Sequence, residues 1–215
     1  MKRVRGQHAG LTRAMVLGGA LDLVDRQGAA SLTMRGLAAE LGVEAMALYH
    51  HVSNKDQLLD GLVELVVGDA VPPESTGREW REFMRSYGLR LSARLRAHPE
   101  VLPLVATRPA LTPTVLRMLD RGVRVLQEGG FPPGWALQAI HVVTGFVVGS
   151  LGAFPETTGD GGDPERVERL SAVELADFPA LQAAVTCGHA PGSGQDLFLV
   201  TLDALIEGLA SAASR

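Results

Sequence analysis

The side chains that could act as a nucleophile or a base gather near the C-terminus. Cys187, His189 and Ser193 lie close together in the sequence, a grouping that could support nucleophilic catalysis. The stretch around them is rich in Gly and Pro and lacks the G-x-S-x-G elbow that exposes a catalytic Ser. The other candidates are scattered along the chain: His98, His141 and Asp196. Because no H-E-x-x-H zinc motif occurs either, the sequence favours a protein that is not an enzyme, with no metal site and no cofactor.

Basic side chains are concentrated in the first quarter of the chain. Residues 1–55 carry seven Lys and Arg against four Asp and Glu, a net charge of +3, whereas the rest carries −7, which gives −4 for the 215 residues. A basic quarter of an acidic protein can bind a polyanion. An ordinary solvated surface explains the same distribution, so charge alone leaves both interpretations open.

Apolar spacing and helix-end signals predict helices throughout, and no stretch shows the sustained alternation of a strand. Thr33 is expected to cap a second short helix that ends at Gly42, and a third follows over residues 45–50. Ser53 is expected to open the next helix as the first residue of a capping box. The expected helices after residue 72 are Glu79–Ala97, Glu100–Ala106, Pro113–Glu128, Pro133–Phe154, Glu165–Val185 with a break near Phe178, and Gly194–Ala213.

The helix, Gly42 turn and short helix form a compact corner in this prediction. Leu37, Leu41 and Leu48 can pack against the first helix, which starts near residue 11. One face of the short helix then remains free to enter the major groove of DNA, which admits a single α-helix. Helical corners are common in structural proteins, so the basic charge of this quarter strengthens the DNA-binding interpretation.

Two runs make the interpretation specific. Residues 32–44 (LTMRGLAAELGVE) and 47–59 (ALYHHVSNKDQLL) resemble the DNA-binding domain of the tetracycline-repressor (TetR) family, from its second helix to the start of its fourth. The second half resembles the tetracycline-repressor type of C-terminal domain. Its landmarks are Trp80, Ala97-His98-Pro99, Thr107-Arg108-Pro109 and Gly130-Phe131.

The resemblance implies an all-α fold, with an N-terminal three-helix helix-turn-helix DNA-binding domain and a larger helical domain for ligand binding and dimerisation. The expected divisions are a flexible basic arm over 1–10, the helix-turn-helix domain over 11–55, a connecting helix over 56–71, and the effector-binding and dimerisation domain over 72–215.

The resemblance also implies which residues bind DNA. Tyr49 and Lys55 are expected to contact phosphates, which supplies affinity without reading sequence, and His50 is a further phosphate candidate. Arg35 is expected to read a guanine through a bidentate contact, worth about 1–3 kcal/mol of discrimination. Thr33 completes the expected contacts at the start of the second helix.

Three residues of the third helix have no hydrogen-bonding side chain: Ala45, Met46 and Ala47. They are expected to read thymine methyl groups or groove shape. Other interpretations stay open for two of the residues: a buried ring for Tyr49, and an ion pair with Glu40 or Asp25 for Arg35. The arm over 1–10 can contact DNA or remain a solvated tail.

The larger domain is expected to dimerise and to bind a small molecule. The segments 133–154 and 194–213 are apolar on more than one side, and the resemblance implies that they pair with their symmetry mates; a thick monomeric core is the alternative. The expected effector pocket draws on residues that could equally be plain core: Trp80, Phe83, Tyr87, His98, Leu104, Met118, His141 and Phe146. The family's tetracycline and magnesium ligands align with Val71, Leu104 and Gly122, none of which can ligate a metal, so the expected effector is apolar and metal-free.

These features together predict a repressor that binds a palindromic, double-stranded DNA operator as a homodimer and is released by its effector. An activator, or a DNA-binding protein without an effector, fits the same sequence. The single Cys fits a reducing cytoplasm, and no secretory signal opens the chain. Its longest apolar run, Ile140–Phe154, is shorter than the ~20 residues of a membrane span. A cytoplasmic protein without membrane contact is therefore expected.

Overall fold

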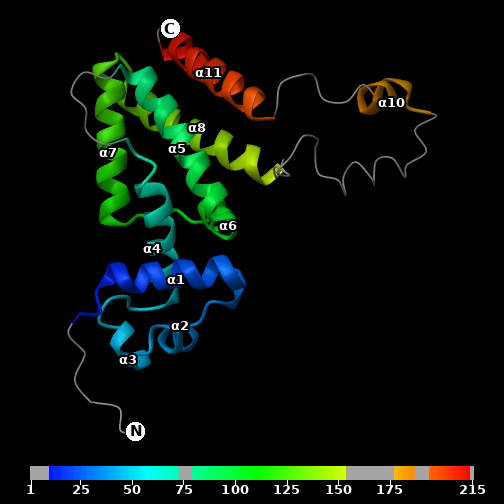
Figure 1. Cartoon of the computed structure of the whole chain (residues 1–215). Helices are drawn as coiled ribbons and strands as arrows, with labels where there is room; N and C mark the ends of the chain where they lie inside the picture. Colours follow the sequence, from blue (N-terminus) through cyan, green and yellow to red (C-terminus); the bar gives the residue numbers. More distant parts are fainter. Residues whose placement is uncertain (1–9, 73–78, 154–176, 187–193, 214–215) are drawn as a thin grey trace.

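The computed structural model describes residues 10–72, 79–153, 177–186 and 194–213 (Figure 1). This part of the chain is helical and contains no strand, which confirms the expected all-α class. The α-helices are α1 Arg13–Gln27, α2 Met34–Leu41, α3 Ala45–Leu48, α4 Lys55–Gly68, α5 Trp80–Ala97, α6 Leu102–Thr107, α7 Pro113–Glu128, α8 Pro133–Ala153, α10 Pro179–Thr186 and α11 Gly194–Ala213. Short 3-10 helices occupy η1 Ala29–Ser31 and η2 Pro99–Val101.

Several expectations fall outside the described residues. They concern the basic arm over residues 1–9, the proposed helix from residue 165 up to residue 176, and the loop with Cys187, His189 and Ser193.

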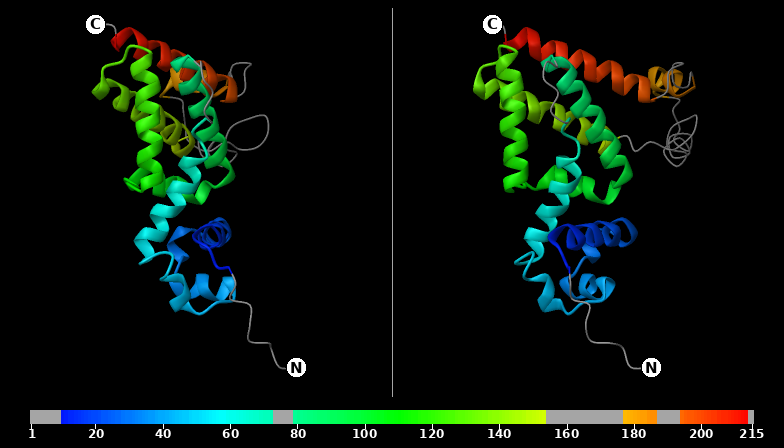
Figure 2. Two further views of the ribbon diagram at one scale, coloured as in Figure 1. Left: turned by 90° about the vertical axis from the view of Figure 1, so that its left-hand side faces the viewer. Right: turned by 60° about the vertical axis from the view of Figure 1, so that its left-hand side comes forward.

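The helices form a small bundle and a large bundle joined by α4. Helices α1, α2 and α3 gather at the end of the molecule opposite α11, and α4 leads from them into the larger group of α5 to α8 and α11 (Figures 1 and 2). Helix α4 packs against α1 on one side and against α5, α6 and α7 on the other. A rotation of α4 therefore changes the position of the small bundle relative to the large one.

Side-chain oxygens cap four of these helices at their N-termini. Thr12, Thr33, Asn54 and Thr112 accept hydrogen bonds from the backbone amides of Met15, Gly36, Gln57 and Val115. Each cap satisfies one amide that a helix start leaves without an intrahelical partner. The expected starts of α2 and α7 are therefore confirmed. Both could be predicted because a cap is a signal that lies within a few residues of the helix start.

The start of α4 differs from the expectation by one residue. Asn54, rather than Ser53, is the N-cap, and the side-chain oxygen of Gln57 accepts from the Ser53 amide at 2.9 Å. The side-chain oxygen Oδ1 of Asn54 accepts from the Gln57 backbone amide at 2.8 Å while the Asn54 backbone is extended, so Asn54 takes the position that we expected Ser53 to hold. Gly42 ends α2 at φ +67°, the left-handed conformation that glycine adopts without strain.

Helix α8 is long and apolar. Residues 133–152 have the length and mean hydropathy of a membrane-spanning helix, with 28% of the segment buried inside the chain. Within the structure α8 packs against α5, α6, α7 and α11. A core helix of a bundle has the same length and composition, and the outward part of α8 remains uncovered in the single chain.

Candidate nucleic-acid interface

Helix α3 presents one face outward at the tip of the molecule. Leu37 of α2 and Leu48 of α3 are fully buried, so apolar contacts hold the corner together. On the outer side of α3, Met46 is 72% exposed. Figure 1 places α3 and α2 at the end of the molecule away from the large bundle. This arrangement leaves the short helix accessible to the major groove of a DNA duplex.

Three polar side chains around this face have no hydrogen-bond or ion-pair partner among the described residues: Tyr49, His50 and Lys55. Tyr49 is 44% exposed, which excludes the alternative of a buried ring with an internally satisfied hydroxyl. Lys55 is the first residue of α4, directly after its Asn54 cap. The phosphate contacts assigned to these side chains stay predictions, and all three are available to make them.

Arg35 is exposed and forms no ion pair within the described part of the chain. The two acids proposed as its partners are engaged elsewhere. Glu40 accepts from Arg26 at 2.8 Å, and Asp25 accepts from His98 at 2.8 Å. Thr33 is less available, because its hydroxyl oxygen caps α2 by accepting from the Gly36 amide at 3.0 Å. Arg35 thus remains free to contact a base.

A bidentate ion pair joins the first helix to α4. The two terminal nitrogens of Arg13 donate to the two carboxylate oxygens of Glu64, each at 3.0 Å. Burial raises the pKa of Glu64, but hydrogen bonds from Arg13, Thr112 and Thr114 outweigh it and hold this pKa below its ordinary 4.5. The two Thr residues flank the start of α7. One carboxylate therefore links α1, α4 and α7.

A second ion-pair group joins the loop after α6 to α4. Arg108 donates from Nε to Asp60 at 3.0 Å and from a terminal nitrogen to Asp56 at 3.1 Å. The hydrogen bond to Asp60, followed by that to Asp56, raises the pKa of Arg108 above its ordinary value. The guanidinium is therefore a permanent cation between the two carboxylates.

His98, one of the residues expected in the effector pocket, forms an ion pair with the small bundle. Its Nδ1 donates to the carboxylate of Asp25 at 2.8 Å, which connects the end of α5 to the last turn of α1. This contact helps to hold the small bundle against the large one, and the place of His98 in an effector pocket stays a prediction. Sequence separation hid this pairing, because the two residues are 73 positions apart.

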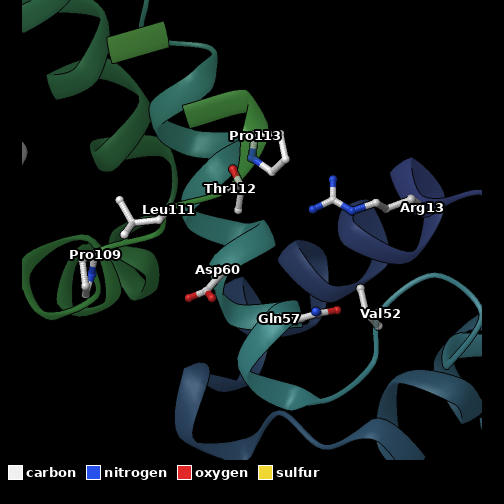
Figure 3. A pocket seen from close by; sticks show the side chains of 8 residues that line it. All are labelled: Arg13, Val52, Gln57, Asp60, Pro109, Leu111, Thr112 and Pro113. Atoms are coloured by element: carbon white, nitrogen blue, oxygen red, sulfur yellow. The ribbon is translucent and has the colours of Figure 1, made fainter. Parts of the chain in front are cut away.

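A cavity of about 360 Å³ lies at this same junction (Figure 3). Its wall combines the small bundle, the start of α4 and the loop between α6 and α7. The lining residues are Arg13, Val52, Gln57, Asp60, Pro109, Leu111, Thr112 and Pro113. None of the residues expected to form the effector pocket lines it.

Three of the eight expected pocket residues are buried side chains of the large bundle. Trp80, Phe83 and Tyr87 are buried on α5, and the Trp80 ring meets Phe131 edge to face at 4.7 Å between centroids. The Tyr87 hydroxyl lies 2.8 Å from Thr144, and burial raises its pKa. These contacts join α5 to Phe131 and to α8.

The remaining expected pocket residues lie around this packed centre. Phe146 stacks on Phe198 at 5.2 Å between centroids. Leu104 and Met118 are partly buried, whereas His141 is exposed on α8. Within the described part of the chain, no three His, Cys, Asp or Glu side chains lie close enough to hold a metal. The effector pocket stays a prediction.

Helices α8 and α11 carry large apolar side chains that the single chain leaves exposed. They are Trp135 (43%), Val142 (43%), Leu197 (68%) and Val200 (65%). The inner sides of the same helices are buried, with Val143 and Leu202 at 0% exposure. Both helices are therefore apolar toward the core and toward solvent, which is typical of helices that meet a second subunit.

Sequence reasoning missed the polar residues that connect the two bundles. Arg13, Glu64 and Asp60 had no assigned role. Asp56 was expected only as the acidic residue of the capping box, and Arg108 only as a landmark of the C-terminal domain. Residues 56, 60 and 64 are spaced by four, so they share one face of α4. This acidic stripe was the available signal, but its partners come from distant parts of the chain.

Comparison with known families identifies both parts of the chain. The model described as "Bacterial regulatory proteins, tetR family" matches residues 16–62, which include α2, α3 and the start of α4. The model described as "Tetracyclin repressor-like, C-terminal domain" matches residues 72–213.

Individual proteins are similar over nearly the whole chain. An HTH-type transcriptional regulator of Saccharopolyspora erythraea is 33% identical over 86% of this chain and 78% of its own. The tetracycline repressor protein class A from transposon 1721 of Escherichia coli is 32% identical over 91% and 88%. The crystal structure of the Streptomyces coelicolor TetR family protein ActR in complex with actinorhodin has a TM-score of 0.74 at 25% identity, covering 95% of this chain and 98% of that one.

Proposed function

Because the chain belongs to the tetracycline-repressor (TetR) family of transcriptional regulators, we propose that it is a repressor that binds a palindromic DNA operator as a homodimer. A small effector would release it. The observation that carries the proposal is the outward face of α3, with Tyr49, His50 and Lys55 around it and no partner for them among the described residues.

The proposed DNA contacts fall into two groups. Tyr49, His50 and Lys55 bind phosphates and set the register on the duplex. Arg35 reads a guanine edge, and the third helix reads methyl groups and groove shape through Met46 and its neighbours Ala45 and Ala47. The hydroxyl oxygen of Thr33 already accepts the hydrogen bond that caps α2. Its O–H can still donate to a phosphate, so Thr33 belongs to the first group.

Dimerisation follows from the geometry of the target. Two readers must lie about 34 Å apart to enter successive major grooves on one side of the duplex. The exposed apolar faces of α8 and α11 support a two-fold interface formed by these helices, within the segments 133–154 and 194–213. Burial of Leu197 and Val200 from two subunits would remove four large apolar side chains from water.

The proposed effector is a small, apolar molecule that binds without a metal. The tetracycline repressor relative and the ActR structure with actinorhodin support a small-molecule ligand. Gly122, aligned with a ligand-binding Gln of the family, is buried, and a Cβ there would lie 2.8 Å from Ile140. The wall of the bundle at this position is therefore apolar and closely packed, which favours a ligand other than the tetracycline–magnesium complex.

Release requires a change in the angle between the two bundles. Helix α4 contacts α1 on one side and α5, α6 and α7 on the other. An effector that shifts the large bundle would turn α4 and alter the half-site spacing of the dimer. Only a ligand with different affinities for the two arrangements can do this. A DNA-binding regulator of this kind works in the cytoplasm and carries no catalytic activity in this proposal.

Gel retardation with the DNA upstream of the protein's own gene tests the proposal. We expect specific retardation that weakens steeply as salt is raised, because Lys and Arg release counterions from phosphates. The variant Tyr49→Phe with Lys55→Ala should bind all duplexes more weakly. It should also lower the salt slope by about 0.9, for the one phosphate that Lys55 neutralises. An Arg117→Ala variant on α7, in the large bundle, is the matched control.

Unchanged affinity and slope in the double variant would remove Tyr49 and Lys55 from the interface. Retardation that is the same for every duplex, in the wild-type protein, would overturn a specific operator. Transcription that falls rather than rises in a strain lacking the protein would identify an activator.

A further inference from the structure

We propose that Arg108, which lies in the large bundle, is a positioning residue for the Lys55 phosphate contact. This inference rests on the proposed function, because it concerns how the DNA-binding surface is held. Arg108 does not lie at that surface; it acts through the first turn of α4.

The backbone on both sides of Arg108 is tightly held. Its amide donates to the Leu104 carbonyl at 2.9 Å, which ties it to the end of α6, and its own carbonyl accepts from the Ala110 amide at 3.0 Å. Pro109 between them has a fixed φ. The guanidinium is thus attached to a short, constrained turn of the large bundle rather than to a free loop.

The side chain of Arg108 holds three acceptors on the first two turns of α4. They are the carboxylate of Asp60 at 3.0 Å, the carboxylate of Asp56 at 3.1 Å and the backbone carbonyl of Asp56 at 3.4 Å. Positions 56 and 60 are one helical turn apart, so one planar guanidinium can reach both. The Arg108 side chain is only 25% exposed, which limits its freedom to swing away.

Among the polar links from the large bundle to α4 described above, the Arg108 contact lies nearest to Lys55 along the helix. Other polar links from the large bundle reach α4 later: Thr112 and Thr114 at Glu64, and Arg94 at Asp69. Lys55 immediately precedes Asp56 and forms no ion pair with a described residue. Fixing Asp56 through both its side chain and its carbonyl therefore fixes the backbone that carries the Lys55 amine.

The positive charge of Arg108 also favours the contact between Lys55 and a phosphate. Asp56 is 77% exposed beside Lys55, where an unpaired carboxylate would repel DNA phosphates. Arg108 supplies the compensating positive charge from behind the helix. Loss of Arg108 would both loosen the first turn of α4 and leave two carboxylates without their partner. Figure 3 shows Asp60 and Pro109 together on this side of α4.

A double-mutant cycle on DNA binding tests the inference. The variants are Arg108→Gln, Lys55→Ala and their combination, measured on a duplex that the wild-type protein retards, over a range of salt concentrations. We expect Arg108→Gln to weaken binding about tenfold, within the range for coupled residues of one network, and to lower the salt slope as Lys55→Ala does. In the Arg108→Gln background, Lys55→Ala should then have little further effect.

Two additional variants make the outcome specific. Arg124→Gln removes an exposed arginine that pairs with Asp120 within α7 and should leave affinity and slope unchanged. Arg108→Lys keeps the charge but cannot bond both carboxylates from one plane, so it should restore binding only in part. If Arg108→Gln fails to fold by circular dichroism, Asp60→Asn weakens the same contact from the side of α4 and should show the same non-additivity with Lys55→Ala.

Several results would overturn the inference. One is an Arg108→Gln variant whose DNA affinity and salt slope equal those of the wild-type protein. Another is full restoration by lysine together with additive effects of the two changes, since charge alone would then explain the loss. Absence of retardation by the wild-type protein at every salt concentration would refute DNA binding itself and this inference with it.

Discussion

The Arg13–Glu64 ion pair offers a direct measure of how firmly the small bundle is held to α4. Arg13→Ala would leave the Glu64 carboxylate, whose side chain is only 11% exposed, without its bidentate donor. Removing one partner of a hydrogen bond to a charged group lowers the free energy of unfolding by about 1.5–3 kcal/mol. Because Arg13 itself is 45% exposed, solvent screening reduces this to about 1–2 kcal/mol. A chain of this length should then unfold about 2–8 °C lower.

The loss should depend on pH in a defined direction. The pKa of Glu64 is lower in the folded protein than its ordinary 4.5. Its ionised form therefore stabilises the fold fully above about pH 4.5, and this stability disappears as the pH falls through the folded-state pKa. Arg13 is one of the groups that lower the pKa. The difference between wild type and Arg13→Ala should be largest near neutral pH and shrink below pH 4.5.

Thermal unfolding followed by circular dichroism at several pH values measures this difference. All samples need one protein concentration, because dimerisation shifts the midpoint. Arg26→Ala is the control: its ion pair with Glu40 is exposed on both sides, 55% and 40%, and should contribute little. Equal losses in the two variants, or a loss for Arg13→Ala that persists unchanged at acid pH, would refute the role given to the Glu64 carboxylate.

Three further outcomes are expected. Leu197→Asp should convert the dimer to monomers in sedimentation velocity, because it places a charge on the apolar face of α11; a dimer of wild-type affinity would contradict this interface. Gly129→Ala should lower the free energy of unfolding by about 1–3 kcal/mol in denaturant titration, because a Cβ at this position would overlap the Trp80 ring. Gly134→Ala is the control, since a Cβ there has no atom within 4 Å, and it should cause no such loss. Arg35→Ala should lose about 1–3 kcal/mol of discrimination at one guanine of a selected operator, and an unchanged selected sequence would exclude base reading by Arg35.

Helix boundaries could be read from the sequence where their signals are local. The predicted ranges for Pro113–Glu128 and Gly194–Ala213 are confirmed to the residue, and the Gly42 turn has the expected left-handed conformation. Caps, glycine turns and apolar spacing act within a few residues. The third helix was predicted to extend to His50 but ends at Leu48, with Tyr49 as its C-cap and a turn over residues 49–51. Short helices depend on tertiary packing, which the sequence pattern does not show.

By itself, the sequence determined the all-α class, the helix-turn-helix corner and the side of α3 that must stay free, because periodicity decides which face is apolar. Only the tertiary structure decided which charges meet. Asp25 pairs with His98, Glu64 with Arg13, and Asp60 with Arg108, over separations of 48 to 73 residues. An ion pair needs a short distance in space, and no local signal in the chain encodes a distance between helices that are brought together by packing of the core.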